Sequence, residues 1–153
     1  MMLSKNLSLL EVTKSNTATR MDIDNRPPKE VIVNLRAIAE DVFQPIRDHF
    51  NTPIGISSGY RCKELNRAVR GSRTSQHMSG EALDIDADIM GGLTNAEIFN
   101  YIRENLEFDQ LIWEFGTDSS PDWVHVSYKA KGDNRKRVLR ARRDNKGVYY
   151  APC

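Results

Sequence analysis

The sequence predicts an α+β protein with a small antiparallel sheet and helices packed on one side of it. Helical periodicity is concentrated in the first third of the chain and again after residue 94, whereas short apolar segments between turn residues fill much of the rest. The 153 residues are 39% hydrophobic and 28% charged, which is typical of a globular domain with its own core. We therefore expect a single domain over residues 1–153, with a basic hairpin at about 129–153.

Capping signals predict the first and last helices. Ser8 and Glu11 have the spacing of a capping box, in which each residue satisfies a free backbone amide of the other, and this predicts a helix over 9–14. Thr94 and Glu97 repeat the pattern before a second apolar segment. We expect a helix to begin there, and a polar loop to follow the first helix.

A long helix is predicted from the prolines at 27–28 to residue 50, because proline suits the first turn of a helix. Its apolar residues recur every three or four positions, which is typical of an amphipathic helix facing a core. They are Val31, Leu35, Ile38, Val42, Ile46 and Phe50.

Short apolar segments predict the sheet. The expected strands are residues 54–57, 81–86, 110–115 and 123–128. Residues 137–142 and 148–151 are expected to form a hairpin. Residues 62–69 predict one or two helical turns, and 71–79 lack periodicity and predict a loop.

Composition excludes several classes of protein. No apolar run approaches the roughly 20 residues that a membrane-spanning helix needs. The segment Met1–Val12 lacks the features of a secretory signal, so we expect synthesis in the cytoplasm.

The two cysteines, Cys62 and Cys153, are expected to be free thiols. Nothing in the sequence requires more than a monomer.

Charge is unevenly distributed although the chain carries only +1 overall. Residues 129–146 contain nine lysines or arginines and two aspartates, a net charge of +7, so the remainder carries −6. This segment is interpreted either as a solvated hairpin or as a binding surface for a polyanion such as an anionic cell-wall polymer. No aromatic residues alternate with the charges, and nucleic acid is not the expected partner.

The three histidines have different surroundings. His49 lies at the end of the long helix, where a cation complements the helix dipole. His77 lies in the polar segment SQHMSGEALD, and His125 lies in the strand segment PDWVHVS. Two imidazoles and one carboxylate are a recurrent ligand set for catalytic zinc, with a fourth position left for water. The sequence therefore favours a metal site that includes His77 and His125.

Nearby residues support such a site. Gly80 permits a positive φ, and strand alternation puts Ala82, Asp84 and Asp86 on one face. Asp86 is then either a hydrogen-bond partner of a ligating histidine or an exposed carboxylate. Asp122, at the start of the strand that carries His125, is the candidate for moving the proton of a water molecule.

These residues resemble the signature of the zinc D-alanyl-D-alanine carboxypeptidase family, which includes dipeptidases and phage endolysins that cut peptidoglycan peptides. The resemblance spans about residues 7–128 and includes an upstream block at Ser58–Cys62, with Leu65, Asn66 and Val69 after it. The residues of the signature itself are Ser75, His77, Gly80, Ala82, Asp84, Asp122 and His125. The resemblance implies a hedgehog/D-Ala-D-Ala-peptidase-like fold in the short, single-domain branch of the family.

The resemblance also implies roles for individual residues. One Zn²⁺ per chain would be bound by His77, Asp84 and His125. Asp122 would be the catalytic base, although many relatives carry the longer glutamate at this position. Independently of the resemblance, Glu114 lies near in a strand and is the fallback acid or base. Arg61 would face the scissile carbonyl and stabilise the oxyanion. The expected substrate-binding residues are Tyr60, Ser75 and Gln76, and the alternative for Ser75 and Gln76 is that they hold the loop.

The sequence thus predicts a zinc peptidase that hydrolyses amide bonds in peptidoglycan stem peptides, as a carboxypeptidase or an endopeptidase. We expect it to act on the cell wall, as a phage lysin or a virion-associated enzyme. One alternative is a non-haem iron oxygenase, but its carboxylate usually follows the first histidine by two residues, whereas Met78-Ser79 follow His77. The other is an inactive metal-bearing wall-binding module, which the presence of Asp122 and Arg61 disfavours.

Overall fold

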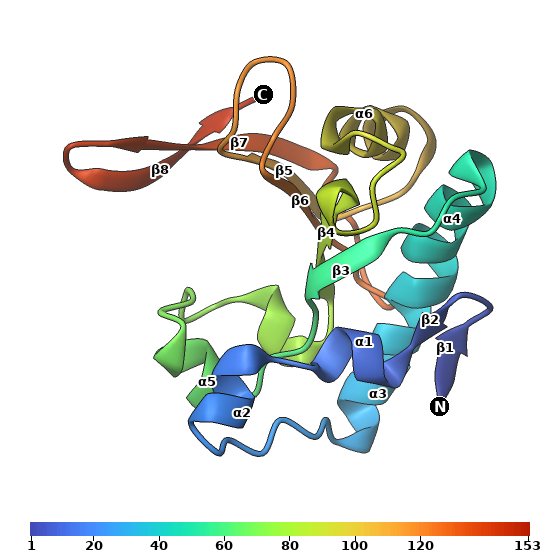
Figure 1. Cartoon of the computed structure of the whole chain (residues 1–153), viewed down its shortest axis with the longest axis vertical. Helices are drawn as coiled ribbons and strands as arrows, with labels where there is room; N and C mark the ends of the chain where they lie inside the picture. The colour runs from blue at the N-terminus through green and yellow to red at the C-terminus, as the bar shows by residue number, and fades with distance from the viewer.

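A computed structural model describes all 153 residues and has the predicted α+β class. Six strands form the main sheet in the order β3-β4-β6-β5-β7-β8, and a separate two-stranded sheet pairs β1 with β2 (Figure 1). The strands are β1 (Met2–Ser4), β2 (Leu7–Ser8), β3 (Gly55–Ser58), β4 (Ala82–Asp86), β5 (Gln110–Glu114), β6 (Trp123–Ser127), β7 (Arg137–Asp144) and β8 (Gly147–Pro152).

The helices follow the sequence signals closely. They are α1 (Leu9–Thr13), α2 (Asn16–Arg20), α3 (Lys29–Ile38), α4 (Gln44–Phe50), α5 (Lys63–Ala68) and α6 (Asn95–Asn105). Both predicted capping boxes are present, before α1 and before α6. The helix α2 was not predicted, and it forms because the Ser15 side chain accepts a hydrogen bond from the Ala18 amide at its start. None of the helices is long and apolar enough to span a membrane.

The predicted long helix exists, but it contains a change of winding. A π-helical segment, η1 (Ala39–Phe43), joins α3 to α4. Pro45 follows at the start of α4 and has no amide proton to donate, so regular α-helical bonding is interrupted at this point. Asn51, with φ of 48°, ends the helix in the left-handed conformation.

The core lies between one face of the sheet and the helices α3, α4 and α6 (Figure 1). The predicted stripe of the long helix is buried from Val31 to Ile46, and Phe50 packs at its edge. Alternate residues of β4 and β6, among them Leu83, Ile85, Val124 and Val126, are fully buried against it. The other side chains of these strands point to the opposite face, which the long helix and α6 do not cover.

The sheet is mixed, and the prediction of an antiparallel sheet was wrong in this respect. Strand β7 forms the expected antiparallel hairpin with β8 but runs parallel to β5, from the pair Gln110–Arg137 to the pair Glu114–Ala141. Residues 128–136 cross the start of β5, so β7 begins beside the first residue of β5. Alternation of apolar and polar residues predicts a strand, but it does not predict which strand it pairs with or in which direction.

A buried carboxylate holds this crossing in place. Asp109 is fully buried just before β5, and its oxygens accept hydrogen bonds from the guanidinium and the backbone amide of Arg135. The hydrogen bonds from Arg135 hold the pKa of the Asp109 carboxyl far below its usual range. Asp109 also accepts a hydrogen bond from Gln76, at 3.1 Å. The loop before β7 is therefore tied to the segment that carries His77.

Candidate metal centre

Three separate elements bring the proposed ligands together on the face of the sheet opposite the long helix and α6. Asp84 on β4 and His125 on β6 are directly paired across the two strands, so their side chains leave the sheet side by side. His77 comes from a short 3₁₀ helix, η2 (Gln76–Ser79), that lies just before β4. The sequence predicted a loop at this place, and the single turn of helix is what aims the imidazole at β4.

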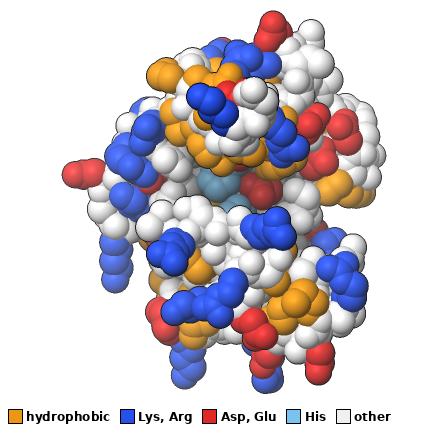
Figure 2. Space-filling view, turned by 90° about the vertical axis from the view of Figure 1, so that its left-hand side faces the viewer, with side chains coloured by type: hydrophobic (Ala, Val, Ile, Leu, Met, Phe, Trp, Pro, Cys, Tyr) orange, Lys and Arg blue, Asp and Glu red, His pale blue; other side chains and the backbone are white.

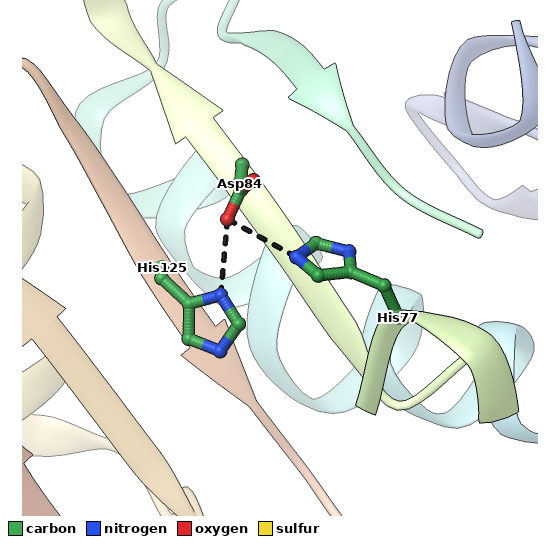
Figure 3. A group of neighbouring side chains, drawn as sticks. All are labelled: His77, Asp84 and His125. Atoms are coloured by element: carbon green, nitrogen blue, oxygen red, sulfur yellow. Dashed lines mark hydrogen bonds and ion pairs between the residues drawn. The ribbon is translucent and has the colours of Figure 1, made fainter. Parts of the chain in front are cut away.

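The three side chains converge on one point (Figure 3). The Asp84 Oδ1 atom lies 3.3 Å from His77 Nε2 and 3.0 Å from His125 Nδ1. All three potential ligand atoms lie within 4.8 Å of one another. Zinc bonds of about 2.0–2.1 Å in a tetrahedral shell separate neighbouring ligand atoms by about 3.3 Å. The donor set and its spacing therefore fit a small divalent cation.

A backbone carbonyl orients His77. The Gly59 carbonyl lies 2.6 Å from His77 Nδ1, so Nδ1 donates a hydrogen bond to it and Nε2 is the ring nitrogen that faces Asp84. Asp86, considered as a partner of a ligating histidine, does not have this role. It accepts hydrogen bonds from Asn95 and from the Asp88 amide instead.

Two glycines permit this arrangement. A side chain at Gly59 would lie 2.4 Å from the Val12 carbonyl oxygen, so the backbone can pass here only with glycine. This backbone position is the one that brings the Gly59 carbonyl to His77. Gly80 has a φ of 75°, and a side chain there would lie 2.7 Å from Val31 on the long helix. The chain can therefore turn from η2 into β4 only with glycine at that position.

Burial and charge make Asp84 a strong ligand. Burial alone would raise the pKa of its carboxyl, but the charges and hydrogen bonds of His77 and His125 outweigh this effect and hold that pKa well below its usual value. The carboxylate is therefore ionised at any pH at which a metal would bind. Its side chain is only 15% exposed, which limits competition from water.

The ligands line a cleft of about 620 Å³. Figure 2 shows the histidines and an acidic side chain at the bottom of a hollow, with lysine and arginine side chains on the surrounding surface. The cleft has the volume of a binding site for a short peptide or a molecule of similar size.

Comparison with known families agrees with this geometry. Residues 5–127 match the family model described as Peptidase M15, which is the zinc D-Ala-D-Ala carboxypeptidase family. The chain belongs to this family. No curated protein gives a significant match. Membership in M15 supports a metallopeptidase, and zinc as the metal that His77, Asp84 and His125 would hold.

Other predicted residues of this M15 peptidase lie at different distances from the ligands. Arg61, Ser75 and Gln76 line the cleft. The Arg61 guanidinium donates to Ser75 Oγ at 3.3 Å, and its buried Nε has no hydrogen-bond partner. Burial lowers the pKa of Arg61, which nevertheless stays charged. Tyr60 was expected to bind substrate, but its ring is buried in the core and does not line this cleft.

The two candidate carboxylates for proton transfer are in contrasting places. Asp122 is exposed and does not line the cleft. Glu114 lines the cleft on β5 and is 7% exposed, and its carboxyl accepts no hydrogen bond from the protein. Burial raises the pKa of Glu114 to about 7, with the nearby Asp84 charge acting in the same direction and His125 opposing it. A carboxyl with this pKa can both accept and release a proton near neutral pH.

Sequence reasoning did not foresee two parts of the site. The Gly59 carbonyl carries no side-chain signal, and only the folded chain brings it to His77. The hairpin residues Leu139, Arg143 and Tyr150 also line the cleft. Alternation along β7 could have placed Leu139 and Arg143 on one face, but only the parallel pairing with β5 brings that face to the ligands.

The raised pKa of Glu114 has a measurable effect on stability. In metal-free protein the folded state binds this proton more tightly than the unfolded state, so stability falls as pH rises from the ordinary value near 4.5 through about 7. Glu114→Gln removes this loss. As the pH rises from 5 to 8, we expect the unfolding free energy of the natural protein to fall by roughly 2–3 kcal/mol relative to that of the variant. Urea unfolding with a chelator present measures the difference, and parallel stability curves would contradict it.

Proposed function

We propose that this M15 peptidase hydrolyses amide bonds in peptidoglycan stem peptides, as a carboxypeptidase or an endopeptidase that depends on one zinc ion per chain. The observation that carries the proposal is the cluster of His77, Asp84 and His125, with zinc-like spacing, at the bottom of a cleft in a chain of this family. The family match favours hydrolysis over the iron-oxygenase alternative. The resemblance to phage endolysins supports the bacterial cell wall as the place of action.

Zinc, when bound, supplies an acidified water with a pKa of about 7 and a positive charge beside the reacting carbonyl. His77, Asp84 and His125 would hold the ion, and with only three protein ligands a water molecule could also bind it. The chain's own contribution is to hold the substrate, to stabilise the negative charge that develops on the carbonyl oxygen, and to move one proton from water to the leaving amine.

Arg61 is the proposed stabiliser of that negative charge. Its guanidinium is partly buried, lines the cleft and has an Nε–H group without a partner. A permanently charged donor held in a partly desolvated place gains more from a developing oxyanion than it would in water. The hydrogen bond to Ser75 restrains its orientation.

A carboxylate is needed to take the proton from the water and deliver it to the amine. The resemblance to the family supports Asp122 in this role. Burial, position in the cleft and a pKa near 7 support Glu114. Because a base must reach the reacting water directly or through one further water, the cleft position favours Glu114 of the two.

Digestion of purified peptidoglycan with zinc-loaded protein, followed by mass spectrometry of the fragments, tests the proposed function. We expect cleavage at one type of peptide bond, no cleavage after treatment with a chelator, and recovery on addition of zinc. His77→Ala is expected to lose both bound zinc and activity. His49→Ala is the matched control, since His49 packs against Phe50 and Tyr101 away from the cleft. Zinc-loaded protein that releases no peptide fragment would refute the proposal.

Paired substitutions identify the base. We expect Glu114→Gln to lower kcat by about 10²–10⁴-fold while zinc stays bound, because the amide cannot accept the proton. Asp122→Asn is expected to keep most of the activity. Steady-state kinetics on the peptide released in the digestion, with zinc content measured for each variant, gives the comparison. The reverse pattern would assign the proton transfer to Asp122.

A further inference from the structure

The C-terminal hairpin is part of the cleft, although it lies outside the family match. The match ends at residue 127, and β7 and β8 follow it. Four hairpin residues, Leu139, Arg143, Val148 and Tyr150, line the same cleft as the metal ligands. In Figure 1 the hairpin extends to the same side of the molecule as the segment after α5, and Figure 2 views the hollow from that side.

Arg143 is held in place without a carboxylate partner. Its guanidinium carbon lies 5.0 Å from the centre of the Phe115 ring, a cation–π contact that fixes the side chain at the cleft. Phe115 in turn packs against Trp123, at 5.6 Å between ring centroids. Arg143 makes no ion pair, whereas Arg140 on the same strand pairs with Asp118. Its charge is therefore available to a ligand.

The charges around the cleft favour an anionic ligand. Three arginines line it, Arg61, Arg70 and Arg143, against two acidic residues, Asp84 and Glu114. Asp84 would be a ligand of the metal, and the charge of a bound metal would make the cleft still more positive. Tyr150 adds a hydroxyl on the hairpin side, and burial together with the charges of Glu114 and Asp84 raises its pKa, so it stays a hydrogen-bond donor at neutral pH.

We propose that the hairpin β7–β8 is a substrate-binding wall of the catalytic cleft and that Arg143, beside Tyr150, binds a free carboxylate of the peptide substrate. This inference rests on the proposed function and narrows its substrate class to peptides that carry a carboxylate near the cleaved bond. It also gives part of the basic C-terminal charge a role at the cleft in place of general binding to a wall polymer.

The test compares two probes that differ only in charge. They are the stem pentapeptide L-Ala-γ-D-Glu-L-Lys-D-Ala-D-Ala and its diamide, in which both carboxylates are carboxamides. Arg143→Gln is expected to lower kcat/KM for the free acid about tenfold to a hundredfold, the usual effect of losing a charge-assisted hydrogen bond. The diamide should change less than threefold. Arg142→Gln is the matched control, because its side chain is on the opposite face of β7 and does not line the cleft.

A binding measurement separates this inference from the proposed function. Metal-free protein cannot turn the probes over, and Trp123 in the cleft wall provides a fluorescence signal. We expect tighter binding of the free acid than of the diamide, and loss of that preference in Arg143→Gln alone. If neither probe is hydrolysed but this preference holds, the hairpin proposal stands and the peptidase proposal fails for these peptides. An Arg143→Gln variant that keeps the preference, or that loses affinity for both probes equally, overturns the hairpin proposal.

Discussion

The pairing of β4 with β6 is the constraint on which the site depends. Asp84 lies directly opposite His125, and both residues point away from the core because their neighbours Leu83, Ile85, Val124 and Val126 point into it. A slip of one residue would turn either strand over and separate the carboxylate from the imidazole. The apolar face that stabilises the fold thus also fixes the ligand positions.

This arrangement explains how a carboxylate can be buried here. A charged side chain in a largely dry place is costly unless opposite charge and hydrogen-bond donors surround it. Asp84 faces two imidazoles, and a divalent cation between them would satisfy all three groups. Glu114 has no such partner and keeps its proton to a higher pH. Two carboxyls in one cleft are thereby given different protonation states by their surroundings.

Local signals in the sequence were sufficient for most of the secondary structure. The capping boxes and the stripe from Val31 to Ile46 predicted the helices, and the segments around His77 and His125 led to residues that lie together in the fold. Long-range features were not accessible. The parallel pairing of β7 with β5 depends on how residues 128–136 cross the sheet and on the buried charge of Asp109. Three other features also depend on long-range packing of the folded chain. They are the burial of Tyr60 in the core, the position of Glu114 in the cleft and the approach of the Gly59 carbonyl to His77.

The coordination of zinc in the loaded protein, measured by X-ray absorption at the zinc edge together with metal content, tests the central claim most directly. The account predicts one zinc per chain in a four-coordinate shell of nitrogen and oxygen atoms, with two imidazoles and no sulfur. Zinc bound through the thiols of Cys62 or Cys153, a shell with fewer than two imidazoles, or a protein that retains no zinc would contradict it.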